Sequence, residues 1–372
     1  MCQNHAHRNP PFRAEHVGSL LRPRRLKEAY SRHEAGELDD DAYEQVVEDE
    51  IARAIRLQED AGLQSITDGE FRRNSWFGFF FHGLDGLSLK DSKFAFKDSE
   101  GHTYTWPTCF FHGKIRRIRP ICTPEFLTVQ KHTSRTPKAT MPSPSAFHFF
   151  RGRDAVDPKA YPDLEGFWDD LLAVYSQEIR ELHEAGCRYI QFDEVPLAML
   201  CDANVRQQVR EQGEDPDAFI AAYVRMLQRV LAVVPEDVAT GIHMCRGNFR
   251  SRWMAEGGYE AVAEQVFAEV PIDAFFLEYD SPRAGDFSPL RLMGKDKLVV
   301  LGMISTKSSE LEDKDALKRR LDEAAQYVPL DRLALSPQCG FASVAGGNVL
   351  DEAQEVAKLR RVAEVAAEVW PQ

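Results

Sequence analysis

The chain has 372 residues, of which 43% are hydrophobic and 28% are charged, and its formal net charge is −13. This length fits two ordinary domains or one large α/β barrel, and the apolar content is sufficient for a sizeable core. The acidic balance and the absence of a basic block argue against nucleic acid and anionic membranes as partners. No apolar run is long enough to span a membrane, and residues 1–11 are polar, so we expect neither an anchor nor a signal peptide.

Short apolar runs alternate with long amphipathic segments along the chain. The runs predict strands at 12–17, 64–67, 138–141, 188–192, 238–242 (continuing into His243), 274–277, 297–302 and 332–335. Helical spacing of apolar residues predicts helices over 40–61, 164–185, 217–234, 259–270, 309–327 and 351–369. Seven scattered cysteines, an odd number, make a disulfide framework unlikely and favour a reducing cytosol.

Residues 87–137 interrupt this alternation and are rich in Phe, Tyr, Lys and Arg. We predict a strand-rich excursion there, a hairpin or small subdomain that serves as cover or as an oligomer contact. Eight strand-and-helix units are what a (β/α)₈ TIM barrel requires, so we expect one barrel domain over 1–372, with 87–137 inserted after the second unit. A doubly wound open sheet is the alternative, but no Gly-x-Gly-x-x-Gly follows the first strand and no Walker motif is present.

Reactive side chains stand at the ends of the predicted strands. In a barrel the carboxyl ends of all strands meet on one face, so these side chains are expected to share one mouth. His243 and Cys245 lie two residues apart and point the same way along a strand. The complete set is Ser19, Asp68, Glu70, Asp193, Glu194, His243, Cys245, Glu278 and Cys339.

Four of these residues, His243, Cys245, Glu278 and Cys339, form a suitable tetrahedral set for Zn²⁺. Two thiolates and a carboxylate make such a centre electron-rich and a poor generator of hydroxide. It suits a different task, which is to bind a substrate thiol and lower its pKa while leaving the thiolate nucleophilic. Taken singly, Cys339 also fits a buried loop cysteine, and Glu278 also fits a salt-bridge partner.

Carboxylates at the end of a buried strand are costly unless they are paired or take part in function. Asp193 is therefore a candidate for binding a substrate ammonium group, and Glu194 is either a supporting partner or solvated. Glu70 stands in a polar group with Asn74, for which a surface ion-pair network is the alternative. Ser19 is a candidate for a hydrogen bond to a substrate carboxylate, with a simple turn serine as the alternative.

These residues resemble the C-terminal catalytic barrel of cobalamin-independent methionine synthase, in the short single-barrel branch of that superfamily. The resemblance extends over nearly the whole chain and is carried by Val17-Gly18-Ser19, Asp68-Gly69-Glu70 with Asn74, Gln191-Phe192-Asp193-Glu194, His243-x-Cys245, Glu278 and Pro337-Gln338-Cys339-Gly340. It implies zinc ligation by His243, Cys245, Glu278 and Cys339, and homocysteine binding by Ser19, Glu70 and Asp193, with Asn74 beside them. The implied reaction is methyl transfer to a zinc-bound homocysteine thiolate, which gives methionine.

Three departures from the family concern the methyl donor. The long enzymes have a second, N-terminal barrel that helps to hold polyglutamylated folate, and this chain is too short to contain one. Ser305 and Lys307 stand where those enzymes have an Asp-x-His pair for proton delivery, so Lys307 joins Asp193 as a candidate catalytic residue. A pterin-stacking tryptophan after the third strand is replaced near Phe149 and Phe150.

Three functions are therefore compared. The leading hypothesis is a cytoplasmic zinc-dependent methyltransferase of methionine biosynthesis, with a homocysteine-like thiol as acceptor and methyl-folate, a methylated corrinoid or another small molecule as donor. The second keeps the zinc and the thiol but uses an epoxide or another alkyl electrophile. The third is a metal-free barrel like uroporphyrinogen decarboxylase, which needs a cationic cleft. The sequence leaves the oligomeric state open, including a homo-oligomer.

Overall fold

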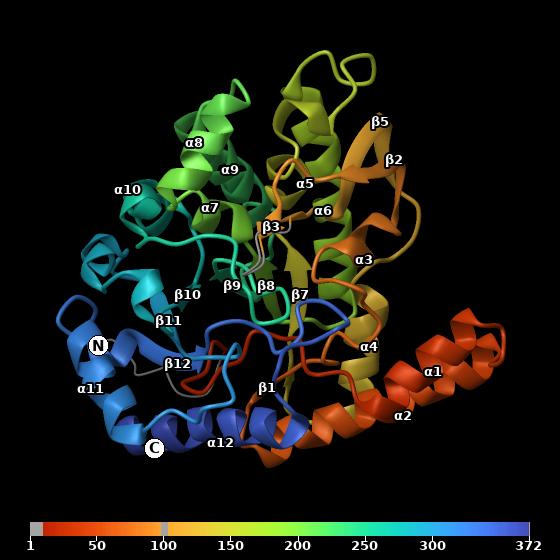
Figure 1. Cartoon of the computed structure of the whole chain (residues 1–372). Coiled ribbons are helices and arrows are strands. Elements are labelled where there is room, and N and C mark those ends of the chain that lie inside the picture. The colour runs from red at the N-terminus through yellow and green to blue at the C-terminus, as the bar shows by residue number, and fades with distance from the viewer. Residues whose placement is uncertain (1–9, 98–102, 372) are drawn as a thin grey trace.

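The structure is a computed structural model that describes residues 10–97 and 103–371 (Figure 1). Six parallel strands form one sheet in the order β12-β11-β10-β9-β8-β7. They are β7 (Ala139–Pro142), β8 (Tyr189–Asp193), β9 (Ala239–Met244), β10 (Ala274–Glu278), β11 (Leu298–Ile304) and β12 (Leu333–Pro337). Each begins and ends within two residues of a predicted strand, because buried parallel strands are written as continuous apolar runs.

The two remaining predicted strands are shorter than expected. β1 (Ser65–Ile66) pairs in parallel with β6 (Thr136–Pro137), which leads directly into β7. The predicted strand at 12–17 is wrong, since this segment makes only one isolated bridge, from Ala14 to Leu335 of β12. Two backbone hydrogen bonds of 2.9 Å join it to Leu335, and side chains supply the rest: Glu15 accepts from the hydroxyl of Ser65 at 2.7 Å and from the N–H of Phe12 at 3.0 Å. The segment therefore has a single point of backbone pairing, supplemented by side-chain bonds, in place of the full strand that the apolar pattern predicted.

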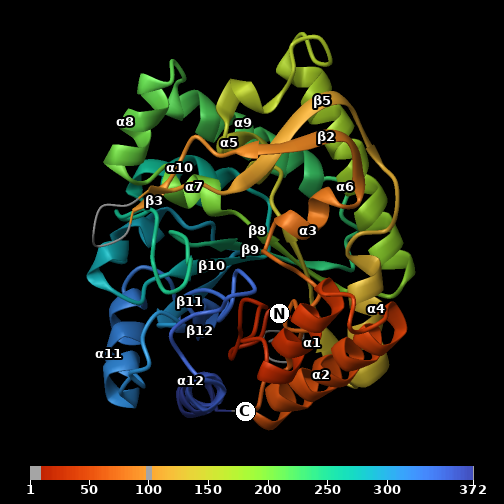
Figure 2. The same ribbon diagram turned by 45° about the vertical axis from the view of Figure 1, so that its right-hand side comes forward.

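Helices surround the strands (Figure 2). The predicted ones are present as α2 (Asp40–Asp60), α6 (Leu164–Glu184), α9 (Pro216–Leu231), α10 (Glu260–Glu269), α11 (Lys314–Ala324) and α12 (Glu352–Val369). α11 begins five residues after the predicted 309 because the side chain of Asp313 accepts from Ala316 N and caps the helix there. Within the described residues, no helix is both long enough and apolar enough to cross a lipid bilayer.

Several short helices were not predicted. They are α1 (Arg24–Glu34), α3 (Gly78–Phe81), α5 (Ala146–Phe149), α7 (Val195–Met199) and α8 (Ala203–Glu211), with the 3₁₀ turns η1 (Gly152–Ala155), η2 (Pro282–Ala284), η3 (Ser288–Leu292) and η4 (Leu330–Arg332). Most are too short to show a helical period. α1 is longer but buries only Leu26 and Ala29, so its apolar stripe is weak.

The segment 87–137 has two different halves. Its first half contains an antiparallel pair, β2 (Leu84–Asp91) with β5 (Pro107–Arg117), and a smaller pair, β3 (Phe96–Lys97) with β4 (Thr103–Tyr104). Its second half contains α4 (Thr123–His132), a helix that the strand-rich prediction did not include. β5 packs against α6, and the β2–β5 pair lies beside that helix (Figure 1). Residues 98–102 of this segment and most of the polar start lie outside the described residues.

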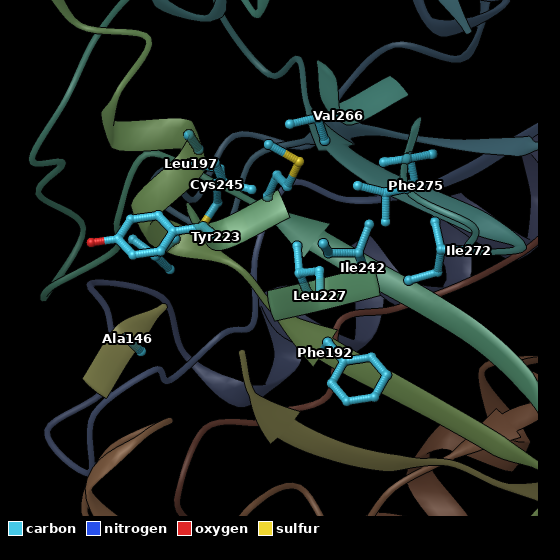
Figure 3. Packing of buried hydrophobic residues seen from close by; sticks show 14 of the residues in the cluster. Ala146, Phe192, Leu197, Tyr223, Leu227, Ile242, Cys245, Val266, Ile272 and Phe275 are labelled. Carbon is cyan, nitrogen blue, oxygen red and sulfur yellow. The ribbon is translucent and has the colours of Figure 1, made fainter. Parts of the chain in front are cut away.

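The core fixes the strands that carry the reactive residues (Figure 3). Phe192 of β8, Ile242 of β9 and Phe275 of β10 are fully buried and lie opposite one another in register. Leu227 of α9 packs into the same cluster, to which Cys245 also belongs. Because such interiors are close-packed, the end of β9 is a rigid support for the residues that follow it.

A buried carboxyl group on α12 is expected to make stability depend on pH. Burial raises the pKa of Glu355 to about 8, from an ordinary value of 4.5, and its Oε1 accepts from the N–H of Leu21 at 2.9 Å. Between these two values the folded state holds a proton that the unfolded state has lost. The free energy of unfolding therefore falls as the pH rises from 4.5 to 8 and is level above that range.

The substitution Glu355→Gln keeps the acceptor oxygen but cannot ionise. We expect it to raise the free energy of unfolding at pH 8 by about 1–4 kcal/mol, since one pKa unit corresponds to about 1.4 kcal/mol. At pH 5 the change should be much smaller. Urea unfolding of both proteins at the two pH values measures this difference, and an equal change at both would contradict it.

Candidate active site

A cavity of about 470 Å³ opens where the parallel strands end. Its lining residues come from the ends of β8 and β9, from the turn after β12, from the loops that follow Val17 and β1, and from α3, β2 and β5. The predicted site residues that line it are Ser19, Glu70, Asn74, Asp193, His243, Cys245 and Cys339. Glu278 and Lys307 are not among its lining residues. The rule that strand ends converge thus places most, but not all, of the predicted set in one cavity.

His243, Cys245 and Cys339 meet at one point of this cavity. Their nitrogen and sulfur atoms all lie within 4.8 Å of one another, and all three residues are buried. The two sulfur atoms are 3.7 Å apart. In the described parts of the chain, neither ring nitrogen of His243 makes a hydrogen bond of acceptable distance and angle, and the polar group that most influences the ring is the thiol of Cys339. Because a buried polar atom without a partner is costly, this cluster is suited to hold a metal ion.

The two thiols of the cluster differ in their acidity. The pKa of Cys339 lies well below its usual range, because the hydrogen bond that it shares with Cys245 and the neighbouring ring of His243 favour its thiolate. The same hydrogen bond, together with burial, raises the pKa of Cys245. The shared hydrogen bond thus favours a thiolate within the pair, and the thiolate is the form of cysteine that binds metals.

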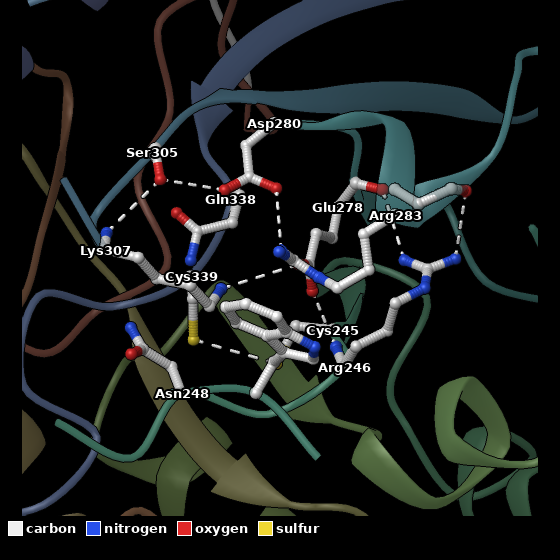
Figure 4. A network of polar contacts seen from close by, with 12 residues as sticks. Cys245, Arg246, Asn248, Glu278, Asp280, Arg283, Ser305, Lys307, Gln338 and Cys339 are labelled. Atoms are coloured by element: carbon white, nitrogen blue, oxygen red, sulfur yellow. Dashed lines mark hydrogen bonds and ion pairs between the residues drawn. The ribbon is translucent and has the colours of Figure 1, made fainter. Parts of the chain in front are cut away.

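Glu278 stands beside this cluster rather than in it (Figure 4). Its Oε2 accepts from the backbone N–H of Arg246 at 2.6 Å, and its Oε1 accepts from Arg283 at 2.7 Å. The ammonium of Lys307 is 3.5 Å from the same Oε1. Burial alone would raise the pKa of Glu278, but the charges of Lys307 and Arg246 bring it to about 2. In this structure Glu278 forms salt bridges with Arg283 and Lys307, which is the alternative to metal ligation that its sequence position allowed.

Lys307, the candidate for proton transfer, faces the same carboxylate. Its side chain is 6% exposed and pairs with Glu278, so it is not a solvated loop residue. Ser305, two residues earlier, donates from its hydroxyl to Asp280 at 2.8 Å. Both side chains therefore belong to the ion-pair network around Glu278 (Figure 4).

Asp193 ends β8 and is held by a chain of hydrogen bonds. Its Oδ1 accepts from Nε2 of Gln191 at 2.9 Å. The buried ammonium of Lys138 donates to Oε1 of Gln191 at 3.0 Å, so the amide of Gln191 must turn its NH₂ group toward Asp193. Burial raises the pKa of Asp193 to about 7, an effect that His243 opposes and Glu70 reinforces. Among the described residues no ion pair with a lysine or arginine neutralises Asp193, which suits it to a cationic group of a ligand.

Of the other predicted binding residues, Glu70 and Ser19 are also buried, whereas Asn74 is exposed at the edge of the cavity. Glu70 has a left-handed backbone with φ of 61°, and its Oε1 lies 3.3 Å from Arg73 and accepts from Thr140 at 3.1 Å. The pair with Arg73 is thus internal, which rules out a surface network at this position. The hydroxyl of Ser19 accepts from the N–H of Ala342 at 3.3 Å, next to the turn that carries Cys339.

Sequence reasoning missed an aromatic wall of the cavity, formed by Trp76, Phe77, Trp106 and Phe150. Successive ring centroids lie 4.9 Å apart for Trp76 and Phe77, 5.8 Å for Phe77 and Phe150, and 5.2 Å for Phe150 and Trp106. Of the two phenylalanines expected here, Phe150 lines the cavity and Phe149 does not. The sequence did contain one indication of this wall: Trp76 and Phe77 follow closely after the polar group around Glu70, which was already a candidate site.

Comparison with known proteins places these observations in a family. The family model described as "Cobalamin-independent synthase, Catalytic domain" matches residues 12–367. The protein YxjH of Bacillus subtilis is 40% identical over 98% of this chain and 96% of its own length. A protein named methionine synthase in Pyrococcus abyssi is 26% identical over 87% of this chain and 85% of its own. A Listeria monocytogenes structure, assigned as a vitamin-B12-independent methionine synthase, is 30% identical with a TM-score of 0.77, covering 98% of this chain and all of that one.

Proposed function

The chain belongs to the family of cobalamin-independent synthase catalytic domains, and we propose that it is a methyltransferase of methionine biosynthesis. The acceptor is the thiol of homocysteine or a close analogue, and the product is the methyl thioether, methionine. The observation that carries the proposal is the buried cluster of His243, Cys245 and Cys339 in a cavity that Asp193 also lines. The relatives named methionine synthase support it.

The proposed metal is Zn²⁺, held by His243, Cys245 and Cys339, with Glu278 as fourth ligand. Two sulfurs that each lie about 2.3 Å from a tetrahedral Zn²⁺ are separated by about 3.8 Å, and the two sulfurs here are 3.7 Å apart. The unpartnered nitrogens of His243 supply the third donor. Glu278 would join this set by giving up its pairing with Lys307. When bound, the metal lowers the pKa of an incoming thiol.

The residues of the chain then orient the acceptor. Asp193, held by Gln191, accepts hydrogen bonds from the ammonium group of the amino acid. Glu70 adds a second negative charge nearby. The hydroxyl of Ser19 and the amide of Asn74 donate to its carboxylate. With both ends fixed, the thiol sulfur is directed to the cysteine pair, and the buried position of that pair limits the access of water to the sulfur.

Lys307 is proposed to act through Glu278, because its ammonium reaches that carboxylate and does not line the cavity. We expect Lys307→Met to lower turnover by about 10- to 100-fold, the usual effect of removing a partner of a metal ligand. Rate and metal content should be measured together on the same sample. A full rate with full metal content would show that Lys307 has no part in the reaction.

We further propose that the chain is a single (β/α)₈ barrel over 1–372, with 87–137 as an insertion in it. The bridge from Ala14 to Leu335 joins the first segment to β12, and β1 joins β6 and so β7. Neighbouring helices also make contact along most of a ring, from α2 through α4, α6 and α9 to α10, and from α11 through α12 back to α2. A cytoplasmic location is in keeping with six described cysteines that are all free.

The experiment that tests the function is metal analysis of the purified protein, followed by thiol addition with measurement of released protons. About one zinc per chain and proton release on adding homocysteine would support thiol activation whatever the donor is. Zinc without a response to homocysteine would point to another thiol, with an epoxide or other electrophile as partner. Absence of zinc would favour the decarboxylase-like alternative, although no lysine or arginine lines the cavity within the described residues.

A further inference from the structure

The charges of the cavity limit which methyl donors it accepts. Its lining contains the carboxyl groups of Glu70 and Asp193, and among the described residues it contains neither lysine nor arginine. Within the described residues, Glu70 has an internal cation, Arg73, at 3.3 Å, and Asp193 has no lysine or arginine as an ion-pair partner. A donor with several negative charges would enter without a partner for any of them, whereas a donor with a positive charge would be attracted.

The aromatic wall offers the matching surface for a cation. Trp76, Phe77, Phe150 and Trp106 contact one another in series and all line the same cavity as the cysteine pair. Ring faces attract cations through their quadrupole, and aromatic walls are the usual recognition surface for onium groups, which cannot donate hydrogen bonds. Trp106 comes from the connection between β4 and β5, so the segment 87–137 contributes directly to the cavity.

The chemistry of the leaving group gives a second, independent reason. A methyl group on a neutral amine leaves only if a proton is delivered to the nitrogen. Lys307 does not line the cavity and is paired with Glu278, while His82, which lines it, is an exposed residue. The remaining carboxyls, Glu70 and Asp193, are assigned to the acceptor. A methylsulfonium donor needs no proton, because it leaves as a neutral thioether.

We infer that the methyl donor of this enzyme is a small methylsulfonium compound, bound against the wall of Trp76, Phe77, Trp106 and Phe150. The inference rests on the proposed function. The lone pair of the acceptor thiolate forms the new S–CH₃ bond, and the electrons of the old C–S bond return to the sulfonium sulfur. One thiolate and one sulfonium cation thus give two neutral thioethers, and no proton moves in this step.

The test uses the full chain loaded with zinc and two sulfonium probes, trimethylsulfonium and S-methylmethionine. Titration followed by NMR should show that trimethylsulfonium binds about tenfold more tightly than tert-butyl alcohol, a neutral molecule of similar size. Isotope-labelled methyl should pass from at least one sulfonium probe to homocysteine. The triglutamate of 5-methyltetrahydrofolate is the comparison donor and should give less product.

Two substitutions at one position separate the aromatic face from simple bulk. Trp106→Leu should raise the Kd of trimethylsulfonium about tenfold, whereas Trp106→Phe, which keeps a ring, should raise it about threefold or less. Equal binding of the cation and the neutral probe to the unaltered protein would overturn the inference, as would failure of both sulfonium probes to transfer methyl. If the sulfonium inference fails but the proposed function is right, adding homocysteine should still release protons. If no protons are released, the proposed function and the sulfonium inference are both refuted.

Discussion

Replacing Cys339 with serine is expected to give a folded protein that has lost both its metal and its turnover. A serine hydroxyl is a hard, protonated oxygen and a poor substitute for a thiolate at a zinc site. Removing only a partner of a ligand already costs about 10- to 100-fold in affinity or activity, so removal of the ligand should cost more than about 100-fold. Metal analysis after dialysis and a turnover assay measure the two effects, and circular dichroism checks the fold.

Cys187→Ser is the matched control for this experiment. Cys187 is buried like Cys339, but it lies outside the cavity, before β8, and its thiol donates to the carbonyl of Tyr189 at 3.3 Å. A serine hydroxyl can make the same bond, so metal content and rate should stay close to those of the unaltered protein. If Cys339→Ser kept its metal and its rate as Cys187→Ser does, the cysteine pair would not be the site of thiol activation.

The ends of the strands were the most predictable part of the structure. Apolar runs locate β8, β9 and β12, and the rule that their carboxyl ends converge then brings Asp193, His243 and Cys339 to one cavity. That inference needs only the order of elements along the chain. The segment 12–17 shows its limit, because an apolar pattern does not distinguish a hydrogen-bonded strand from a segment that side chains such as Glu15 hold in place.

Two parts of the site depended on contacts that sequence does not reveal. Glu278 ends its strand as predicted, yet its direction is decided by Arg283 and Lys307, which approach from two different loops. The aromatic wall likewise joins Trp76, Trp106 and Phe150 from separate segments. No local period connects such residues, so only the assembled fold brings them together.

The family match and the site answer different questions about this protein. The match over residues 12–367 confirms the family that the sequence motifs had indicated. The half of the cavity beside His243 and Cys245 has the residue types expected for activating a thiol. The other half has an aromatic wall and no lysine or arginine among the described lining residues, and it is the part on which the inferred sulfonium donor depends. A shared acceptor chemistry is therefore compatible with a donor that differs from folate.

Asp193→Asn is expected to raise the KM for homocysteine strongly while leaving metal content unchanged. The asparagine keeps an oxygen that can accept from Gln191, so the local hydrogen bond at 2.9 Å survives and only the negative charge is lost. Breaking one side of a buried charge pair costs about 2–5 kcal/mol. The KM should therefore rise by about 30-fold or more.

A truncated acceptor distinguishes this role from general damage to the site. A simple thiol without an ammonium group makes no contact with Asp193, so its slow methylation should proceed equally in the unaltered protein and in Asp193→Asn. Metal analysis completes the comparison. If Asp193→Asn lost its metal, or lost rate equally with both acceptors, the role of Asp193 would be different. It would then support the cluster of His243, Cys245 and Cys339 and would not bind the substrate. A selective loss with homocysteine would show that this buried, unneutralised carboxylate at the end of β8 is what recognises the amino acid.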